Sequence, residues 1–233
     1  MKNVLITGTS KGLGKELLKV FLENGWQVFA VARNIKDFSD IYEKYPKSCL
    51  PIEGDITDDN ITSRIEKSIK SESGYLDVLI NNAGNAVKLF GIDNVTPKDL
   101  EDHFNVHVSG TFRVIKACLP FLKKAKEPLI INISSRKGSI KNISSGLYRI
   151  LLPYQIAKCA QNMLTACLNQ ELIETNIKTY AIHPGNLKTD VAPPDADTEP
   201  AEAAVKFFKW IVTENKQSTN DFYNLMNDSL LEW

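Results

Sequence analysis

A tyrosine and a lysine stand four positions apart in the segment PYQIAK, as Tyr154 and Lys158. If the segment is helical, both side chains lie on one face and can meet. A free phenol titrates at about pH 10, and a neighbouring ammonium lowers that pKa because it stabilises the phenolate. The pair could then exchange a proton near neutral pH, as carbonyl reduction or alcohol oxidation requires. The spacing is common in helices by chance, so its place in the chain decides its meaning.

The first apolar run of the chain leads directly into a turn rich in glycine. Its sequence is TGTSKGLG, and the residues that could face a ligand are Gly8, Ser10, Lys11, Gly12, Leu13 and Gly14. Glycine permits positive φ and a close approach of phosphate, and a helix start offers unpaired N–H groups to an anion. The spacing G-x-x-x-G-x-G differs from the G-x-G-x-x-G fingerprint and from the phosphate loop that ends in GKS or GKT. We expect a phosphate-binding turn; the alternative is a glycine-rich turn that holds no ligand.

A cation ends the second apolar run, which reads VARN with Arg33 and no acidic residue before Asp37. In dinucleotide-binding folds an acid at this place takes the ribose hydroxyls of NAD, whereas an arginine favours the 2′-phosphate of NADP. Arg33, with Lys11 from the first turn, can make charge-assisted hydrogen bonds to that phosphate. These two cations predict NADP(H) in preference to NAD(H). The alternative is that both are solvated surface charges.

Short apolar runs alternate with longer amphipathic stretches, and these elements must position the residues above. The runs expected to form strands are 4–7, 27–32, 49–52, 76–80, 129–133 and 178–182. The stretches expected to form helices are 12–24, 34–45, 58–73, 97–124 and 153–175. The runs lack polar alternation, which is typical of strands covered on both faces. The alternation predicts a doubly wound α/β fold: a mostly parallel sheet with helices on both faces, in a single domain over residues 1–233, with ligands beyond the carboxyl ends of the strands.

Composition and charge argue against several classes of protein. Lys and Arg number 28, as do Asp and Glu, so the formal net charge is zero and nucleic-acid binding by bulk electrostatics is not expected. No apolar run approaches the roughly 20 residues that span a bilayer, and the first apolar run is too short for a secretion signal. Four cysteines without a CxxC pair argue against disulfides or a metal site and fit a reducing cytoplasm. Cys159 and Cys167, two helical turns apart, are expected in the core.

The motifs occur in one order along the chain. After the glycine-rich turn come NNAG at 81–84, Ser134-Ser135, Tyr154 with Lys158, and Pro184-Gly185. As a set they resemble the short-chain dehydrogenase/reductase family, in its compact single-domain branch, over residues 2–190. Within that family, SSRKGSI at 134–140 and the ending LEW resemble the C-factor-like reductases. The resemblance implies a Rossmann-like fold and an oxidoreductase.

The resemblance also implies a role for each matching residue. Ser135 would align the substrate oxygen, Tyr154 would exchange a proton with it, and Lys158 would hold the nicotinamide ribose and lower the pKa of Tyr154. Contacts to the cofactor would come from Gly8, Gly12, Gly14, Asp55, Ile56, Asn82, Ala83, Gly84, Pro184, Gly185, Leu187 and Thr189. In this set Asp55 would take the adenine edge, and the last four residues would line the nicotinamide end. The cofactor would supply the hydride, and the protein orientation and proton exchange.

Two features depart from the family pattern. His107 stands where relatives usually carry an asparagine that holds a water in a proton relay from the lysine. Histidine can donate and accept, so it could serve there as a fourth catalytic residue; it could also disable the relay or merely pack in a helix. Ser135 and Tyr154 lie 19 positions apart, more than in many relatives, and segment 140–152 is expected to shape the substrate mouth. Ser134 is the alternative catalytic serine if the match slips by one position.

These observations predict an NADP(H)-dependent oxidoreductase that reduces a carbonyl of a small organic molecule, or oxidises the alcohol, without a metal. The alternatives are a non-catalytic NADP(H)-binding sensor or scaffold on the same fold, and a nucleotide-sugar epimerase or dehydratase of the family's longer branch. We expect no nucleic-acid or membrane partner and, by resemblance, a homodimer or homotetramer. Residues 190–200 lack apolar periodicity and are expected to form a substrate lid. A helix over 199–215 and a last strand over 218–225 should complete the chain.

Overall fold

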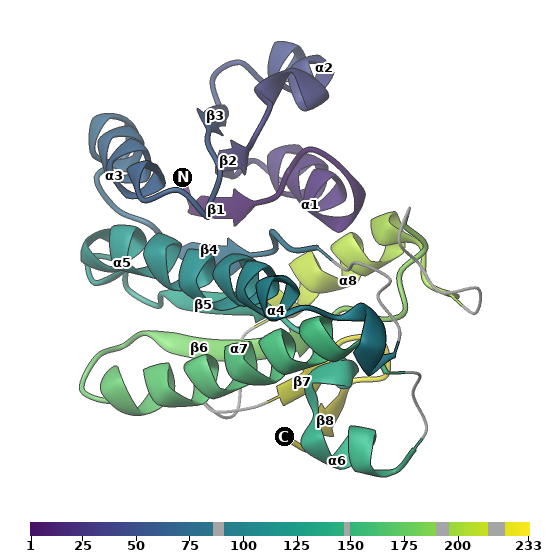
Figure 1. The fold of residues 1–233 in the computed structure, drawn as a ribbon. Coiled ribbons are helices and arrows are strands. Elements are labelled where there is room, and N and C mark those ends of the chain that lie inside the picture. The colour runs from purple at the N-terminus through teal and green to yellow at the C-terminus, as the bar shows by residue number, and fades with distance from the viewer. Residues whose placement is uncertain (86–90, 147–149, 190–195, 214–221) are drawn as a thin grey trace.

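A single eight-stranded sheet forms the centre of the computed structural model, which describes residues 1–85, 91–146, 150–189, 196–213 and 222–233. The strand order is β3-β2-β1-β4-β5-β6-β7-β8 (Figure 1). The strands are β1 (Asn3–Thr7), β2 (Gln27–Ala32), β3 (Cys49–Glu53), β4 (Val78–Asn81), β5 (Leu129–Ile133), β6 (Lys178–His183), β7 (Phe222–Asn224) and β8 (Ser229–Leu231). All neighbours are parallel except β7 and β8. Because β1 pairs with both β2 and β4, the strand order reverses at β1, where ligands of such folds bind.

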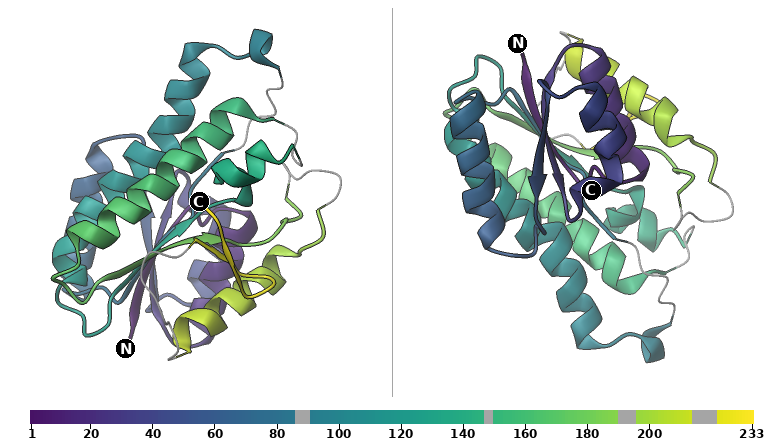
Figure 2. Two further views of the ribbon diagram at one scale, coloured as in Figure 1. Left: turned by 90° about the horizontal axis from the view of Figure 1, so that it is seen from below. Right: turned by 90° about the horizontal axis from the view of Figure 1, so that it is seen from above.

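Helices cover both faces of the sheet, and Figure 2 shows the strands between the two helical layers. One face packs against α1 (Gly12–Glu23) and α8 (Pro200–Val212). The other packs against α3 (Asn60–Glu72), α5 (Thr111–Leu122) and α7 (Leu152–Glu171). Successive strand residues point to opposite faces, so Val4 and Ile6 of β1 belong to the first core and Leu5 to the second. Both faces are therefore apolar, as the unbroken apolar runs predict.

The longest predicted helix, 97–124, is continuous but contains one irregular turn. It consists of α4 (Pro97–Phe104), the π-helical turn η3 (Asn105–Gly110) and α5. Thr96 and Asp99 form a reciprocal capping box at its start, with Pro97 in the first turn. The shorter elements are η1 (Ile35–Phe38), α2 (Ser39–Lys44), η2 (Ile92–Asn94), η4 (Arg136–Gly138) and α6 (Ile140–Ser144). A π-turn inside an α-helix often marks a functional site.

The predicted doubly wound α/β fold is confirmed, with differences in detail. The stretch 34–45 begins as a 3₁₀ turn before α2, and the antiparallel strand β8 was not predicted. The expected last strand is β7, and residues 218–221 of that prediction lie outside the described residues, as do 214–215 of the expected C-terminal helix. The prediction for the cysteines was wrong: Cys159 is half-buried and Cys167 exposed, because they lie toward the outer side of α7. Every helix in the described ranges is too short or too polar to cross a membrane.

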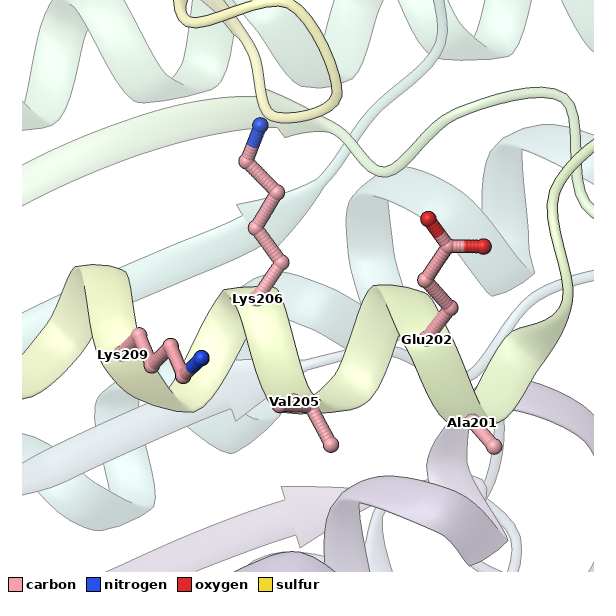
Figure 3. Close-up of a pocket in the computed structure, with 5 residues that line it drawn as sticks. All are labelled: Ala201, Glu202, Val205, Lys206 and Lys209. Atoms are coloured by element: carbon pink, nitrogen blue, oxygen red, sulfur yellow. The ribbon is translucent and has the colours of Figure 1, made fainter.

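The outer surface of α8 carries a shallow hollow, which Figure 3 shows. Its lining residues all come from this one helix and are Ala201, Glu202, Val205, Lys206 and Lys209. Lys206 points to the turn between β7 and β8, where its ammonium donates to Met226 O at 2.7 Å and pairs with Asp228 at 2.9 Å. The hollow thus lies in the helical layer opposite α7, and its main polar side chain fastens the C-terminal hairpin.

Candidate active site

Ser135 and Tyr154 meet beyond the carboxyl end of β5. Ser135 is the N-cap residue of the η4 turn, is 8% exposed, and accepts a hydrogen bond from Lys137 N at 3.2 Å. Tyr154 is in the first turn of α7; burial raises its pKa, while a hydrogen bond with Ser135 acts in the opposite direction. Ser134 is committed elsewhere, because its hydroxyl donates to Asn162 Oδ1. The geometry thus favours Ser135 over Ser134 as the partner of Tyr154.

Lys158 lies one turn along α7 from Tyr154, with its ammonium 5.9 Å from the centre of the phenol ring. It is 5% exposed and donates to Ile133 O at 2.6 Å and to Gln161 Oε1 at 2.9 Å. Burial lowers its pKa to about 7, because an apolar surrounding disfavours the charged form. The predicted four-residue pairing on one helix face is therefore present, and Lys158 can change its charge near neutral pH.

The expected lowering of the Tyr154 pKa by Lys158 does not appear in this structure. The net direction for Tyr154 is upward, with burial as the largest cause. The lysine is itself only partly charged near pH 7, and its hydrogen bonds go to Ile133 O and Gln161 rather than to the phenol. Tyr154 is accordingly protonated at neutral pH and can act as a proton donor. The ammonium of Lys158 lies beside its ring.

His107 lies in the π-turn η3 and packs edge-on against Tyr154, with ring centres 5.6 Å apart. It is 1% exposed, and its Nε2 lies 2.9 Å from Asn85 O. That contact makes Nε2 the donor and leaves Nδ1 as an acceptor, which is buried without a partner among the described residues. Burial, and then the charge of Lys158, hold the pKa of His107 well below its usual range. His107 is therefore a neutral imidazole in contact with the candidate acid.

Gly84 gives His107 its space. A Cβ at position 84 would lie 2.8 Å from Cε1 of the imidazole, closer than carbon atoms approach one another in proteins. Ala83, the preceding residue, has its N–H bonded to Thr7 Oγ1 at 3.0 Å. The NNAG segment thus fits closely against both β1 and the histidine.

The glycine-rich turn is closed on the end of β4. Asn82 donates from Nδ2 to Thr7 O at 2.9 Å and to Gly8 O at 3.2 Å. Gly8 has φ of +75°, which favours glycine. A Cβ at Gly14 would lie 2.1 Å from Gly8 O, so the first turn of α1 packs directly on the loop backbone. These glycines are required by close packing.

The start of α1 has the character of an anion site. Within the described range 1–85, its N-cap Lys11 makes no side-chain capping bond, and the first turn holds no acidic residue. Its N–H groups and helix dipole therefore favour a negative ligand. Gly12 has φ of +55°, and a Cβ there would be 3.6 Å from Thr189 Cγ2, so this turn faces the segment after β6. Ser10 and Leu13 flank Lys11 and Gly12 in sequence.

Arg33 lies just after the end of β2, next to the glycine-rich turn. Gly8 N and Thr9 N both bond to Val31 O, at 2.8 and 3.2 Å, so the first turn rests on the end of β2. Arg33, two residues later, is exposed, as is Lys11 on the turn. The two cations therefore come from adjoining loops after β1 and β2.

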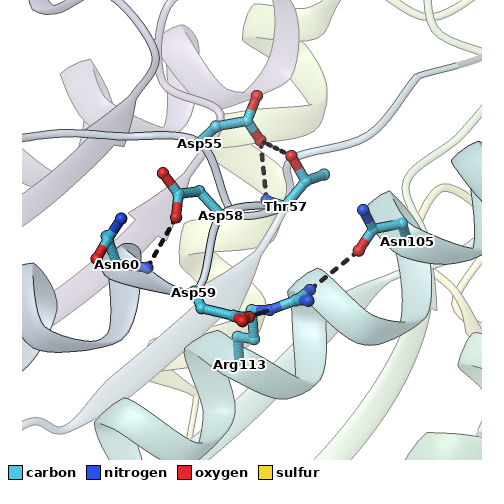
Figure 4. Close-up of polar contacts among 7 residues, drawn as sticks. All are labelled: Asp55, Thr57, Asp58, Asp59, Asn60, Asn105 and Arg113. Carbon is cyan, nitrogen blue, oxygen red and sulfur yellow. Dashed lines mark hydrogen bonds and ion pairs between the residues drawn. The ribbon is translucent and has the colours of Figure 1, made fainter.

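Asp55 follows β3 and is held in one orientation, as Figure 4 shows. Its Oδ1 accepts from Thr57 N at 2.9 Å and from Thr57 Oγ1 at 2.8 Å. The neighbouring Ile56 is buried, and a Cβ on Gly110 would be 3.0 Å from it. Asp55 is therefore held in a fixed orientation beyond the carboxyl end of β3.

A cation connects this region to the π-turn. Arg113 of α5 pairs with Asp59 at the start of α3 and donates to Asn105 Oδ1 at 3.0 Å (Figure 4). Asn105 is the first residue of η3. Arg113 therefore braces the turn that carries His107.

The segment after β6 is fixed at both described ends. Pro184 is buried, and Gly185 has φ of +107° with Met226 Cγ 2.6 Å from where its Cβ would be. Leu187 forms a bridge with Thr198. Residues 190–195 of the predicted lid lie outside the described residues, whereas 186–188 and 197–198 pair through backbone hydrogen bonds of 2.9–3.1 Å. The segment that carries the predicted nicotinamide-end residues is therefore held in place by its packing on Met226 and its pairing with 197–198.

Several polar residues of the site were not predicted. Gln161 and Asn162 of α7 contact Lys158 and Ser134, and Thr7 orients the NNAG segment. Gln161 lies three positions after Lys158, so an i,i+3 search from the lysine could have found it. Thr111, which accepts from Gln161, lies 50 positions away and carries no local signal. In the described ranges, no cluster of His, Cys, Asp or Glu is suited to a metal ion.

Comparison with known proteins agrees with this geometry. A family model described as short chain dehydrogenase matches residues 2–200. Oxidoreductase BOA17 of Botryotinia fuckeliana is 33% identical over 208 residues, covering 87% of this chain and 73% of that protein. The carbonyl reductase Sniffer of D. melanogaster superposes with a TM-score of 0.91 at 28% identity, covering 100% of both chains. The NADPH-bound carbonyl reductase from chicken fatty liver gives 0.87 at 28% identity, covering 100% of this chain and 99% of that one. The chain therefore belongs to the short-chain dehydrogenase family of oxidoreductases.

Proposed function

We propose that this oxidoreductase uses NADP(H) to reduce a carbonyl group of a small organic molecule, or to oxidise the corresponding alcohol, with Tyr154 as general acid and base. The observation that carries the proposal is the contact of Ser135 with Tyr154 beside the buried ammonium of Lys158. Three groups that can align an oxygen, protonate it and tune that proton transfer are thus together at the carboxyl end of β5.

The roles follow from the groups. The Ser135 hydroxyl donates to the substrate oxygen and holds it at Tyr154, whose phenol gives up its proton as the oxygen gains charge. NADPH supplies the hydride when bound. Lys158 then favours the phenolate and holds the nicotinamide ribose, and His107 positions the phenol ring and offers Nδ1 as an acceptor for a relay. In the reverse direction Tyr154 takes the proton of the alcohol.

The cofactor is proposed to lie along the carboxyl ends of the strands from β3 to β6. The residues proposed to contact it are Gly8, Ser10, Lys11, Gly12, Leu13, Gly14, Arg33, Asp55, Ile56, Asn82, Ala83, Gly84, Tyr154, Lys158, Pro184, Gly185, Leu187 and Thr189. The tight glycine turn and the uncapped start of α1 support the pyrophosphate position.

The preference for NADP(H) rests on the two cations. Arg33 and Lys11 come from adjoining loops and carry positive charge where the 2′-phosphate would lie. The chicken carbonyl reductase that this chain resembles was solved with NADPH bound. Residues 190–200 are proposed as the substrate lid, and a homodimer or homotetramer as the assembly.

The test begins with fluorescence titrations of the purified protein with NADPH and NADH. Turnover is then measured as NADPH oxidation across a panel of aldehydes and ketones, for the unaltered protein, Tyr154→Phe and the control Tyr42→Phe. Tyr42 is an exposed residue of α2, so its hydroxyl can be removed without touching the site. Loss of turnover in Tyr154→Phe alone, with NADPH affinity kept, supports the proposal.

Two other outcomes would redirect it. Equal turnover in Tyr154→Phe would remove Tyr154 as the acid. Tight NADPH binding without turnover on any carbonyl would favour the second candidate, a non-catalytic sensor or scaffold, for which the substitution of His107 at the usual asparagine position is the supporting observation.

A further inference from the structure

The ammonium of Lys158 is held by a second side chain of its own helix. Gln161 Oε1 accepts a hydrogen bond from Lys158 Nζ at 2.9 Å, beside the 2.6 Å bond to Ile133 O. Gln161 is 1% exposed and lies on the buried face of α7. A buried amide is costly unless both its ends are hydrogen-bonded, so its partners indicate why it is there.

The other end of the Gln161 amide is anchored across the helix interface. Its Nε2 donates to Thr111 Oγ1 at 3.2 Å. Thr111 is 1% exposed and is the first residue of α5, directly after the π-turn that carries His107. With the amide nitrogen on Thr111, the oxygen is directed at Lys158. One amide therefore joins the lysine to the segment that supports the histidine.

We propose that Gln161 is a positioning residue of the active site, whose carbonyl oxygen holds the Lys158 ammonium beside Tyr154 and whose anchor on Thr111 keeps it there. The inference rests on the proposed function, in which Lys158 acts on Tyr154 and on the cofactor. It adds a residue that contacts neither substrate nor cofactor but determines where, and in which charge state, Lys158 is found.

Several titratable and charged groups lie around Lys158, and nearby charges can shift a pKa. The titratable groups next to it are Tyr154 on α7 and His107 on η3, with His103 of α4 stacked behind His107 at 6.3 Å. The η4 turn, which packs on α7, adds the cations Arg136 and Lys137, whose charges act on His183.

Among the described residues, Lys158 Nζ donates hydrogen bonds to the backbone oxygen of Ile133 and the side-chain amide oxygen of Gln161. Burial already lowers the pKa of Lys158 to about 7. A hydrogen bond to an ammonium favours its charged form, so loss of either acceptor moves that pKa further down.

The experiment measures the charge of Lys158 directly. The protein is labelled with 13C at the ε-carbon of lysine, the Lys158 signal is assigned by its loss in Lys158→Met, and its chemical shift is followed with pH. In Gln161→Leu we expect the midpoint to fall by about one pH unit, the size of one hydrogen bond to a charged group. In Gln161→Glu, which keeps an acceptor oxygen and adds negative charge, we expect it to rise. An unchanged midpoint in Gln161→Leu overturns the proposal.

A matched control separates positioning from packing. Asn169 is a buried amide two turns further along α7, bonded to Thr179 O at 3.2 Å. Asn169→Leu should lower stability and leave the Lys158 midpoint where it is; an equal midpoint shift would overturn the proposal. If Gln161→Leu does not fold, Thr111→Val removes the anchor with an isosteric change. A smaller downward shift there supports the proposal, and no shift overturns it.

Catalysis provides a second readout. Lys158 must be charged to act on Tyr154. Gln161→Leu should therefore move the alkaline limb of kcat for carbonyl reduction to lower pH, by a similar amount. Gln161→Glu should move that limb to higher pH than in the unaltered protein. If the protein reduces no carbonyl, the NMR midpoints still decide the hold of Gln161 on Lys158. A midpoint shift without turnover therefore supports this inference while it defeats the proposed function.

Discussion

Replacement of Lys158 by methionine should change the way stability depends on pH. The pKa of the buried ammonium is about 7 in the folded protein, against 10.5 for an unperturbed lysine. Between these values the unfolded chain binds a proton that the folded protein has released. Stability therefore rises with pH across this window, by up to about 1.4 kcal/mol per unit. Below pH 7 the full cost of burying the charge is present, and above pH 10.5 it is gone.

The magnitude follows from the two pKa values. From pH 7, where the folded lysine is half charged, to pH 9, where it is neutral, the protein should gain about 2 kcal/mol relative to Lys158→Met. The variant leaves the acceptors on Ile133 and Gln161 without the ammonium, a cost that is equal at both pH values and so cancels. His107 stays neutral and Tyr154 protonated over this range, so both cancel too.

Urea unfolding of both proteins at pH 7 and pH 9 measures the effect. The relevant quantity is the difference in unfolding free energy between the proteins at each pH. If that difference is the same at pH 7 and pH 9, Lys158 titrates at its ordinary pKa and the argument from burial is refuted. A change of about 2 kcal/mol in favour of the unaltered protein supports a lysine that titrates near neutrality.

Other parts of the site give predictions of the same kind. Gly14→Ala should destabilise the protein by about 3 kcal/mol or more in urea unfolding, since its Cβ would lie 2.1 Å from Gly8 O; Glu16→Ala on the same helix is the control, and an equally small effect for both would contradict the packing argument. Arg33→Ala should weaken NADPH binding about tenfold in a fluorescence titration and leave NADH unchanged; equal affinities for the two proteins would make Arg33 a surface charge. Burial lowers the pKa of His183 to about 3, so the folded protein excludes a proton that the unfolded chain binds below pH 6.5. Stability should fall by about 2 kcal/mol from pH 7 to pH 5 relative to His183→Gln, and a constant difference between the two proteins would show that His183 titrates normally.

Local patterns were sufficient where the chemistry depends on residues close in sequence. The apolar runs predicted the parallel strands, and the four-residue spacing placed Tyr154 and Lys158 on one helix face. The choice between Ser134 and Ser135 needed the structure, because only the contact with Asn162 shows which hydroxyl is already engaged. The direction of the Tyr154 pKa was also beyond a spacing argument, since burial opposes any effect of the lysine.

Long-range contacts were the part that could not be predicted. Nothing in NVHVSG interrupts a helical pattern, so the π-turn over 105–110 was unforeseen. Gln161 and Thr111 become partners only when α7 packs beside α4 and the π-turn η3, which Thr111 directly follows. The outward position of Cys167 likewise depends on which side of α7 the sheet occupies. In each case the residue can be read from the sequence, but the element that packs against it cannot.

The bonds from Asn82 to Thr7 and Gly8 have a consequence for the order of folding. They join residues that are 75 and 74 positions apart, so the glycine turn takes its final shape only after β4 has docked beside β1. Contacts of such long sequence separation form late, since the loop between them must first be closed. A ligand that binds this turn would therefore meet only the assembled protein. It would slow unfolding and protect the chain from proteolysis, and it would leave the rate of folding unchanged.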